Sequence, residues 1–199
     1  MQAATITGDR FAGGALAAAS LLSILVMAHH PTGQGHSNLN QLVHGAMMAL
    51  VLVIFAGYAR HAMLRGLGRF SILAALIVYG AGVVANLLAA TINGFAAPAA
   101  FEAGVSRDVL RLYWELNQAL AYGGVYATSI AFAIWGLDLL HQRGLRRLVG
   151  VLGLIAGAVP LGLLASGAVT MNVAGAFVIY ALHAGFGVIL GADLMRTRA

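Results

Sequence analysis

Long apolar runs, each bounded by charged or turn-forming residues, dominate this chain. A helix needs about 20 mainly apolar residues to cross the hydrocarbon core of a bilayer. Six runs meet that condition, at residues 11–29, 42–59, 70–93, 116–140, 148–169 and 174–195. The runs are continuous, whereas membrane-spanning strands alternate apolar and polar residues. The pattern predicts an all-α membrane protein, a six-transmembrane-helix bundle in which residues 1–199 form a single integral membrane domain.

Composition removes most other classes of protein. Apolar residues make up 61% of the chain and charged residues 9%, whereas soluble domains have about 25% charged residues. The sequence contains no cysteine and no lysine. This excludes disulfides, iron–sulfur clusters and thiolate zinc sites, and also a Schiff-base lysine or a P-loop lysine.

The arginines indicate which way the bundle is oriented. In a six-span arrangement, only Arg107 and Arg111 would lie on one side. The other side would carry Arg10, Arg60, Arg65, Arg69, Arg143, Arg146, Arg147, Arg196 and Arg198. Because short cytoplasmic loops are rich in arginine and lysine, both termini are predicted to be cytoplasmic. The Ala, Gly and Arg bias favours a bacterial inner (cytoplasmic) membrane. Basic residues are not interleaved with aromatics, so they indicate contact with the lipid bilayer and no nucleic-acid binding.

Three local features refine this topology. Residues 26–28 loosely fit a signal-peptide cleavage site, but residues 1–10 lack net positive charge, which favours a retained helix. On the outer side, residues 30–41 and 94–107 contain prolines and glycines and are predicted to be loops. The amphipathic stretch 108–115 predicts that the fourth helix begins outside the bilayer.

Polar residues recur at helical spacing on five of the six spans. Polar groups inside a bilayer are costly, and they usually face the bundle interior or a wet cavity. Most of them fall in the outer half, which predicts a polar pocket open to the periplasm and lined by the first, second, third, fourth and sixth spans. The candidate cofactor-binding residues are His44, Asn86, Asn93, Tyr122, Tyr126 and His183.

Histidine and methionine gather at the same end. Imidazole suits copper, zinc, iron and haem, and thioether selects copper(I). The candidate metal ligands are therefore His29, His30, His36, His44, Met48 and His183. His44 and Met48 could present two ligands from one helical turn, and haem b could use His44 and His183 as axial ligands. His61 and His141 lie beside arginines on the cytoplasmic side and are predicted to be solvated.

Three other functions stay open. Several histidines with Glu115 could hold zinc, and Glu115 could then act as the catalytic acid or base of a metal-assisted membrane hydrolase or lipid-modifying enzyme. Ser166 and His183, on neighbouring spans, superficially resemble the serine–histidine pair of rhomboid proteases, although in that family a further helix separates the two. The chain could also be an accessory subunit of a larger membrane complex or a homo-oligomer, with its polar stripes in contacts between helices or subunits.

Overall fold

Helices are the regular elements of the computed structural model, which describes residues 2–31 and 38–196. Six helical stretches within these residues are long and apolar enough to cross a bilayer, as in a multi-pass membrane protein. The predicted all-α bundle of six membrane-spanning helices is confirmed. In chain order the elements are α1 (Gln2–Ala28), α2 (Asn38–Arg65), α3 (Phe70–Thr91), the π-helix η1 (Ile92–Ala96), α4 (Ala97–Glu102), α5 (Arg107–Leu140), α6 (Leu145–Ala165) and α7 (Val173–Met195).

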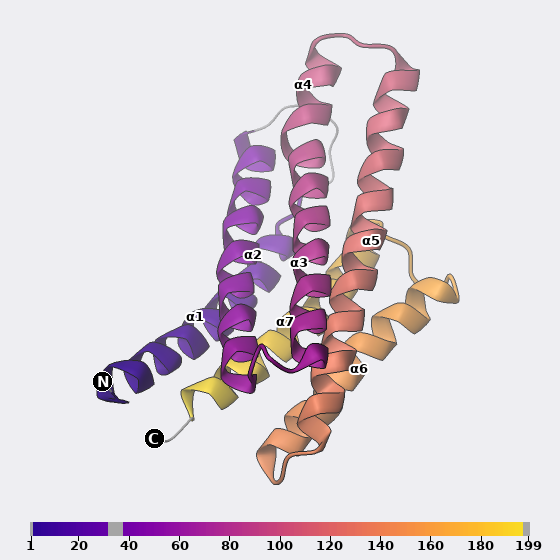
Figure 1. The fold of residues 1–199 in the computed structure, drawn as a ribbon. Helices are drawn as coiled ribbons and strands as arrows, with labels where there is room; N and C mark the ends of the chain where they lie inside the picture. The colour runs from indigo at the N-terminus through magenta and orange to yellow at the C-terminus, as the bar shows by residue number, and fades with distance from the viewer. Residues whose placement is uncertain (1, 32–37, 197–199) are drawn as a thin grey trace.

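The long helices form two crossed layers that close into a ring (Figure 1). Helices α2, α3 and α5 stand in one layer, and α1, α7 and α6 run obliquely behind them. Each long helix packs on its neighbours along the chain, and α7 closes the ring by packing along α1. Large apolar side chains such as Leu25, Ile77 and Leu137 are exposed on the outside, which fits contact with a lipid bilayer.

Glycines bring two pairs of helices into close approach. A Cβ atom added to Gly150 of α6 would lie 2.9 Å from the carbonyl oxygen of Gly136 on α5. One added to Gly191 of α7 would lie 2.5 Å from the carbonyl oxygen of Gly13 on α1. Small residues at such contacts are typical of helix packing in membranes, where van der Waals contact drives association.

Aromatic residues fill the space between the two layers. The indole of Trp135 stacks on the ring of Tyr58, with centroids 5.2 Å apart. Phe132 and Phe186 pack beside them with a centroid separation of 4.8 Å. All four side chains are almost fully buried, and this aromatic floor meets the cavity described below through Tyr58 and Phe132.

One end of the bundle, here the arginine-rich end, carries the turns at 66–69 and 141–144 together with the start of α1 and the end of α7 (Figure 1). Ion pairs tie the helices there. Arg60 on α2 binds Asp9 on α1, with 2.6 Å between Nε and Oδ1. Asp138 on α5 accepts from Arg65, with 2.8 Å between Nε and Oδ2, and also pairs with Arg69. The opposite end, here the far end, carries residues 30–31, 92–101 and Asn172, most of which line a common hollow.

The predicted loop over 94–107 is wrong for most of its length. The third span continues past Thr91 as η1 and then as α4, which ends at Glu102. Pro98 lies in the first turn of α4, where its missing N–H is tolerated. The wide π turn just before it accommodates the break that proline and glycine would otherwise impose. The true turn is short and includes Gly104, whose φ is +68°.

Helix α5 begins well before its apolar run, as predicted. Its 34 residues span about 51 Å at a rise of about 1.5 Å per residue, against a hydrocarbon thickness of about 30 Å. Ser106 caps its first turn by accepting a hydrogen bond from the N–H of Val109. The first turns of α5 and all of α4 therefore rise above the other helices and build the walls of a vestibule at the far end.

Candidate functional site

A narrow cavity of about 200 Å³ lies between the two layers, on the far side of the aromatic floor. Its walls come from α1, α2, α3, η1, α5 and α7, which include all five spans that the sequence predicted to line a pocket. Along α2 the cavity extends from His44 to Tyr58. At a rise of about 1.5 Å per residue, this part of the helix is about 21 Å long. The walls are mainly apolar, so the polar character predicted for the pocket is confined to a few positions.

A second hollow of about 390 Å³, here the vestibule, adjoins this cavity at the far end. It is lined by residues of η1, α4 and the first turns of α5, among them Pro98 and Tyr113. The rim common to both hollows consists of His30, Asn93, Trp114, Asn117, Asn172 and Val173. A ligand that enters from the far end therefore meets one imidazole, one indole and three amides before the apolar walls.

Two of the predicted metal ligands meet at this rim. His30 follows the last turn of α1, and His44 lies in the second turn of α2. Their Nε2 atoms are 3.2 Å apart, and the rings meet edge to face with centroids 4.8 Å apart. His44 is 5% exposed.

The protonation state of this pair follows from its other contacts. Nδ1 of His30 lies 2.9 Å from the carbonyl oxygen of Pro31, and Nδ1 of His44 lies 2.9 Å from that of Asn40. A carbonyl oxygen only accepts, so each Nδ1 carries a proton, and each neutral ring has a bare Nε2. Burial lowers the pKa of His30 below its ordinary value, which favours the neutral ring. Neither Nε2 then carries a proton although the two atoms are only 3.2 Å apart, and the amide N–H of Asn93 lies beside that of His44.

The π turn places Asn93 beside His44. The Nδ2 atom of Asn93 lies 3.2 Å from Nε2 of His44, and the backbone carbonyl of Asn93 accepts from Asn40. A Cβ atom at Gly94 would overlap Cβ of His44, so only glycine permits this approach. Asn93, a predicted cofactor-binding residue, thus belongs to the histidine pair.

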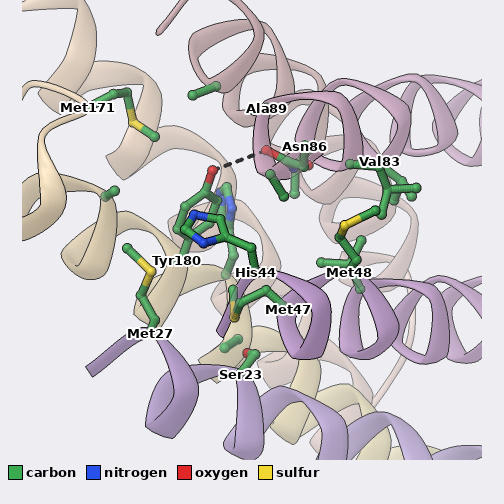
Figure 2. Close-up of a pocket in the computed structure, with 18 of the residues that line it drawn as sticks. Ser23, Met27, His44, Met47, Met48, Val83, Asn86, Ala89, Met171 and Tyr180 are labelled. Carbon is green, nitrogen blue, oxygen red and sulfur yellow. Dashed lines mark hydrogen bonds between the residues drawn. The ribbon is translucent and has the colours of Figure 1, made fainter. Parts of the chain in front are cut away.

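Methionines flank the pair on both helices. Met27 precedes His30 by three residues, Met47 follows His44 by three, and both line the cavity. Figure 2 shows Met27 and Met47 around His44, and Met48 beside Val83. The Oγ1 atom of Thr91 also donates to the sulfur of Met48. The structure therefore favours Met47 over the predicted Met48 as the companion of His44.

Deeper in the cavity, Asn86 on α3 and Tyr180 on α7 link the two layers. The hydroxyl of Tyr180 donates to Oδ1 of Asn86 at 3.1 Å, as Figure 2 shows. A Cβ atom at Gly124 on α5 would lie 2.5 Å from the same oxygen, so this glycine makes room for the amide. Asn86, a predicted cofactor-binding residue, and Tyr180 form a polar bridge across an otherwise apolar passage.

His183 lies apart from the histidine pair. Its Nε2 forms a 3.0 Å hydrogen bond with Oγ of Ser129, while Nε2 of His44 faces His30 and Asn93. An apolar cavity of roughly 150 Å³ holds one benzene, so the narrow cavity is too small for a porphyrin between His44 and His183. These observations count against haem.

The serine pairing is also different from the one considered in the sequence. Ser166 is exposed, and its hydroxyl donates to the carbonyl of Leu163 at 3.2 Å. The serine that binds His183 is Ser129, which is fully buried. Its hydroxyl is out of reach of a substrate, so the resemblance to rhomboid proteases does not extend to the arrangement of these side chains.

The other candidate residues lie outside the cavity lining. The side chain of Glu115 is 61% exposed and lies 3.8 Å from Arg111. Tyr122 is half-buried and Tyr126 is exposed, both on α5, and His29 is exposed with its Nδ1 bound to the carbonyl of Leu25. His36 lies outside the described residues. Within residues 2–31 and 38–196, no three His, Cys, Asp or Glu side chains are close enough to hold a metal ion, so the predicted zinc site with Glu115 as base has no support there.

Two groups of residues were missed by reasoning from the sequence. Trp114, Asn117 and Asn172 form part of the rim, because α5 and the 166–172 turn meet above the cavity. His61, predicted to be solvated, is 3% exposed. The burial of His61 could have been predicted from its spacing of three residues from Tyr58, which places both on one inward face of α2. His141 is exposed as predicted.

No protein-family model matches this chain, and no curated protein or solved structure matches it either.

Proposed function

We propose that this multi-pass membrane protein binds a copper(I) ion between His30 and His44, at the entrance to its cavity. The observation that carries the proposal is the 3.2 Å approach of two Nε2 atoms whose rings already use Nδ1–H to bind carbonyl oxygens. Two unprotonated Nε2 atoms at this distance repel each other, and a cation that replaces the amide N–H of Asn93 on His44 removes that repulsion. A metal-bound histidine commonly donates its other ring N–H to a backbone carbonyl, which fixes the tautomer and the ring orientation.

The separation of the two Nε2 atoms also fits a metal ion. Metal–nitrogen bonds to histidine are about 2.0 Å long, so one ion can reach both nitrogens at an angle close to tetrahedral. Two further ligands are then needed. Met27 lies three residues before His30 and Met47 three residues after His44, and both line the cavity, so each of the two segments can supply one imidazole and one thioether.

The set of ligands selects copper(I) over zinc. Structural zinc sites use four ligands and catalytic ones three protein ligands, drawn from Cys, His and carboxylates. The described residues that line the cavity include two adjacent histidines, four methionines and no carboxylate. Soft thioether ligands favour copper(I), whereas carboxylate ligands suit harder metal ions. A site without carboxylates therefore fits copper(I).

The experiment is a competitive titration of copper(I) against a chromophoric chelator, with untagged protein in mild detergent under reducing, anaerobic conditions. His30→Leu and His44→Leu are each expected to weaken copper(I) binding by about 100-fold or more, since even the loss of an outer partner of a ligand costs roughly 10–100-fold. His29→Leu is the matched control, because His29 is adjacent to His30 but exposed. Unchanged affinity in both variants would overturn the proposal, because copper(I) would then bind elsewhere on the protein.

We also propose that the far end faces the periplasm of a bacterial cell. The described arginines of both turns and of the first and last helices gather at the opposite end, which the positive-inside rule assigns to the cytoplasm. Because the chain has no cysteine, single cysteines report on sidedness directly. In intact cells a membrane-impermeant maleimide is expected to label Ala168→Cys and to leave Gln142→Cys unlabelled. The reverse pattern would contradict this orientation.

A further inference from the structure

Four buried polar side chains lie at and below the inner end of the cavity, and none of their end atoms has a hydrogen-bond partner among the residues that the structure describes. They are Oγ of Ser20, Oη of Tyr58, Nε2 of His61 and Nε1 of Trp135. Each residue is at most 3% exposed. Burying such groups without a hydrogen bond is unfavourable, so unpaired groups of this kind normally bind water or a ligand.

The four groups follow one another from the inner end of the cavity toward the arginine-rich end, and are here called the column. Ser20 and Tyr58 line the inner end of the cavity. Their hydroxyl oxygens converge on Gly187 of α7, because a Cβ atom there would overlap the first and lie 3.4 Å from the second. Below them, the ring of Tyr58 stacks on Trp135, and Trp135 meets the edge of His61 with centroids 6.0 Å apart.

The column ends at the buried ion pairs of the arginine-rich end. His61 lies within electrostatic reach of Arg65, Asp138 and Arg146. Asp138 follows Trp135 by three residues on α5, and Arg65 follows His61 by four on α2, so both charges lie one turn below the column. Arg65 and Asp138 bind each other at 2.8 Å, and Arg69, which pairs with Asp138, is 53% exposed and reaches the surface.

The cavity and the column together are as long as a bilayer is thick. From His44 to Tyr58 the cavity follows α2 for about 21 Å, and from Tyr58 to Arg65 the column follows it for about 10 Å more. The whole length of about 31 Å matches the hydrocarbon thickness of about 30 Å. The cavity and the column together therefore cover the thickness of the hydrocarbon core, with mainly apolar walls along the cavity and polar groups along the column.

We propose that Ser20, Tyr58, Trp135 and His61 bind a file of water molecules that continues the cavity to Asp138, and that this file carries protons across the membrane. Water can both donate to the imidazole nitrogen and accept from the indole N–H, so one file supplies partners to all four groups. Protons pass along hydrogen-bonded water, and imidazole is the side chain most often used to relay them. The proposal does not depend on copper binding.

Radiolytic hydroxyl-radical footprinting of the unmodified protein tests whether the column holds water. Radicals formed from bound water attack the side chains beside it, so Tyr58 and Trp135 are expected to be oxidised despite their burial. Phe132 and Phe186 are matched controls, since they are buried in the same core and carry no polar atom. Oxidation of Tyr58 and Trp135 no greater than that of the two phenylalanines, after correction for intrinsic reactivity, would overturn the proposal.

Proton flux into liposomes tests the function of the file. Protein in vesicles with an internal pH-sensitive dye is expected to conduct protons under a potassium-diffusion potential. Tyr58→Phe, which keeps the stacked ring and removes only the hydroxyl, and His61→Leu are expected to reduce this flux to the level of protein-free vesicles. Tyr122→Phe, on the same bundle but outside the cavity lining, should leave it unchanged. A flux that both variants retain would overturn the proposal.

Discussion

Asp138→Asn is expected to lower the free energy of unfolding by about 3 kcal/mol, because it leaves the Arg65 guanidinium buried without its countercharge. The side chains of Arg65 and Asp138 are 15% and 3% exposed, so water cannot replace the lost partner. Arg69 is half-exposed and can turn outward. The measurement is a titration of the purified protein with sodium dodecyl sulfate in mixed micelles, followed by circular dichroism.

Asp193→Asn is the matched control at the same end of the bundle. The partner of Asp193 is Arg146, at 3.4 Å, and the Arg146 side chain is 41% exposed. Exposed pairs contribute about 1 kcal/mol or less, so this variant should stay within that range of the wild type. Equal losses in the two variants would show that burial of the Arg65 pair does not determine its contribution.

Gly150→Ala is expected to lower the free energy of unfolding by about 2 kcal/mol or more, through separation of α5 from α6. The added Cβ atom would lie 2.8 Å from the backbone nitrogen of Leu140 and 2.9 Å from the carbonyl oxygen of Gly136. Backbone atoms cannot rotate away as a side chain can, so the two helices must move apart along their contact. The same detergent titration measures the loss.

Gly162→Ala provides the comparison on the same helix. No atom lies within 4 Å of a Cβ added at Gly162, and the residue is exposed. Alanine is the better helix former by up to about 1 kcal/mol, so this variant is expected to be neutral or slightly more stable. A loss at Gly162 as large as that at Gly150 would mean that glycine flexibility, and not close packing, is what α6 requires.

The membrane-spanning helices were predictable because the number of consecutive apolar residues can be counted directly in the sequence. The segment after Asn93 was not, since Pro98 and Gly104 are ordinary signs of a loop. Only the structure shows that a π turn absorbs the proline and lets the helix continue to Glu102. Local sequence does not specify whether an extra residue enters a helical turn, because tertiary contacts such as that of Gly94 with His44 decide it.

For the site, the sequence identified most of the residue types but not their partners. His30, His44 and Asn93 stood out as polar groups in an apolar chain, and the structure brings them together. His183 was equally prominent, yet it binds Ser129. Whether a polar residue on a helix faces the cavity or the outside depends on how that helix is rotated about its own axis. That rotation is set by packing between helices distant in sequence, so Glu115 was placed in the site although it faces outward.

The ring closes between α1 and α7, which has a consequence for biogenesis. Helix α1 enters the membrane long before α7 is synthesised, and its close-packed face, with Gly13 and Ser20, meets α7 at Gly191 and Gly187. Until then that face, including the hydroxyl of Ser20, is exposed to lipid or to the insertion machinery. Contacts between such distant segments form late, because a long loop must close first. A nascent chain stalled before α7 would therefore present an uncovered face of small residues with a serine hydroxyl, the kind of surface by which membrane quality control can recognise an incomplete bundle.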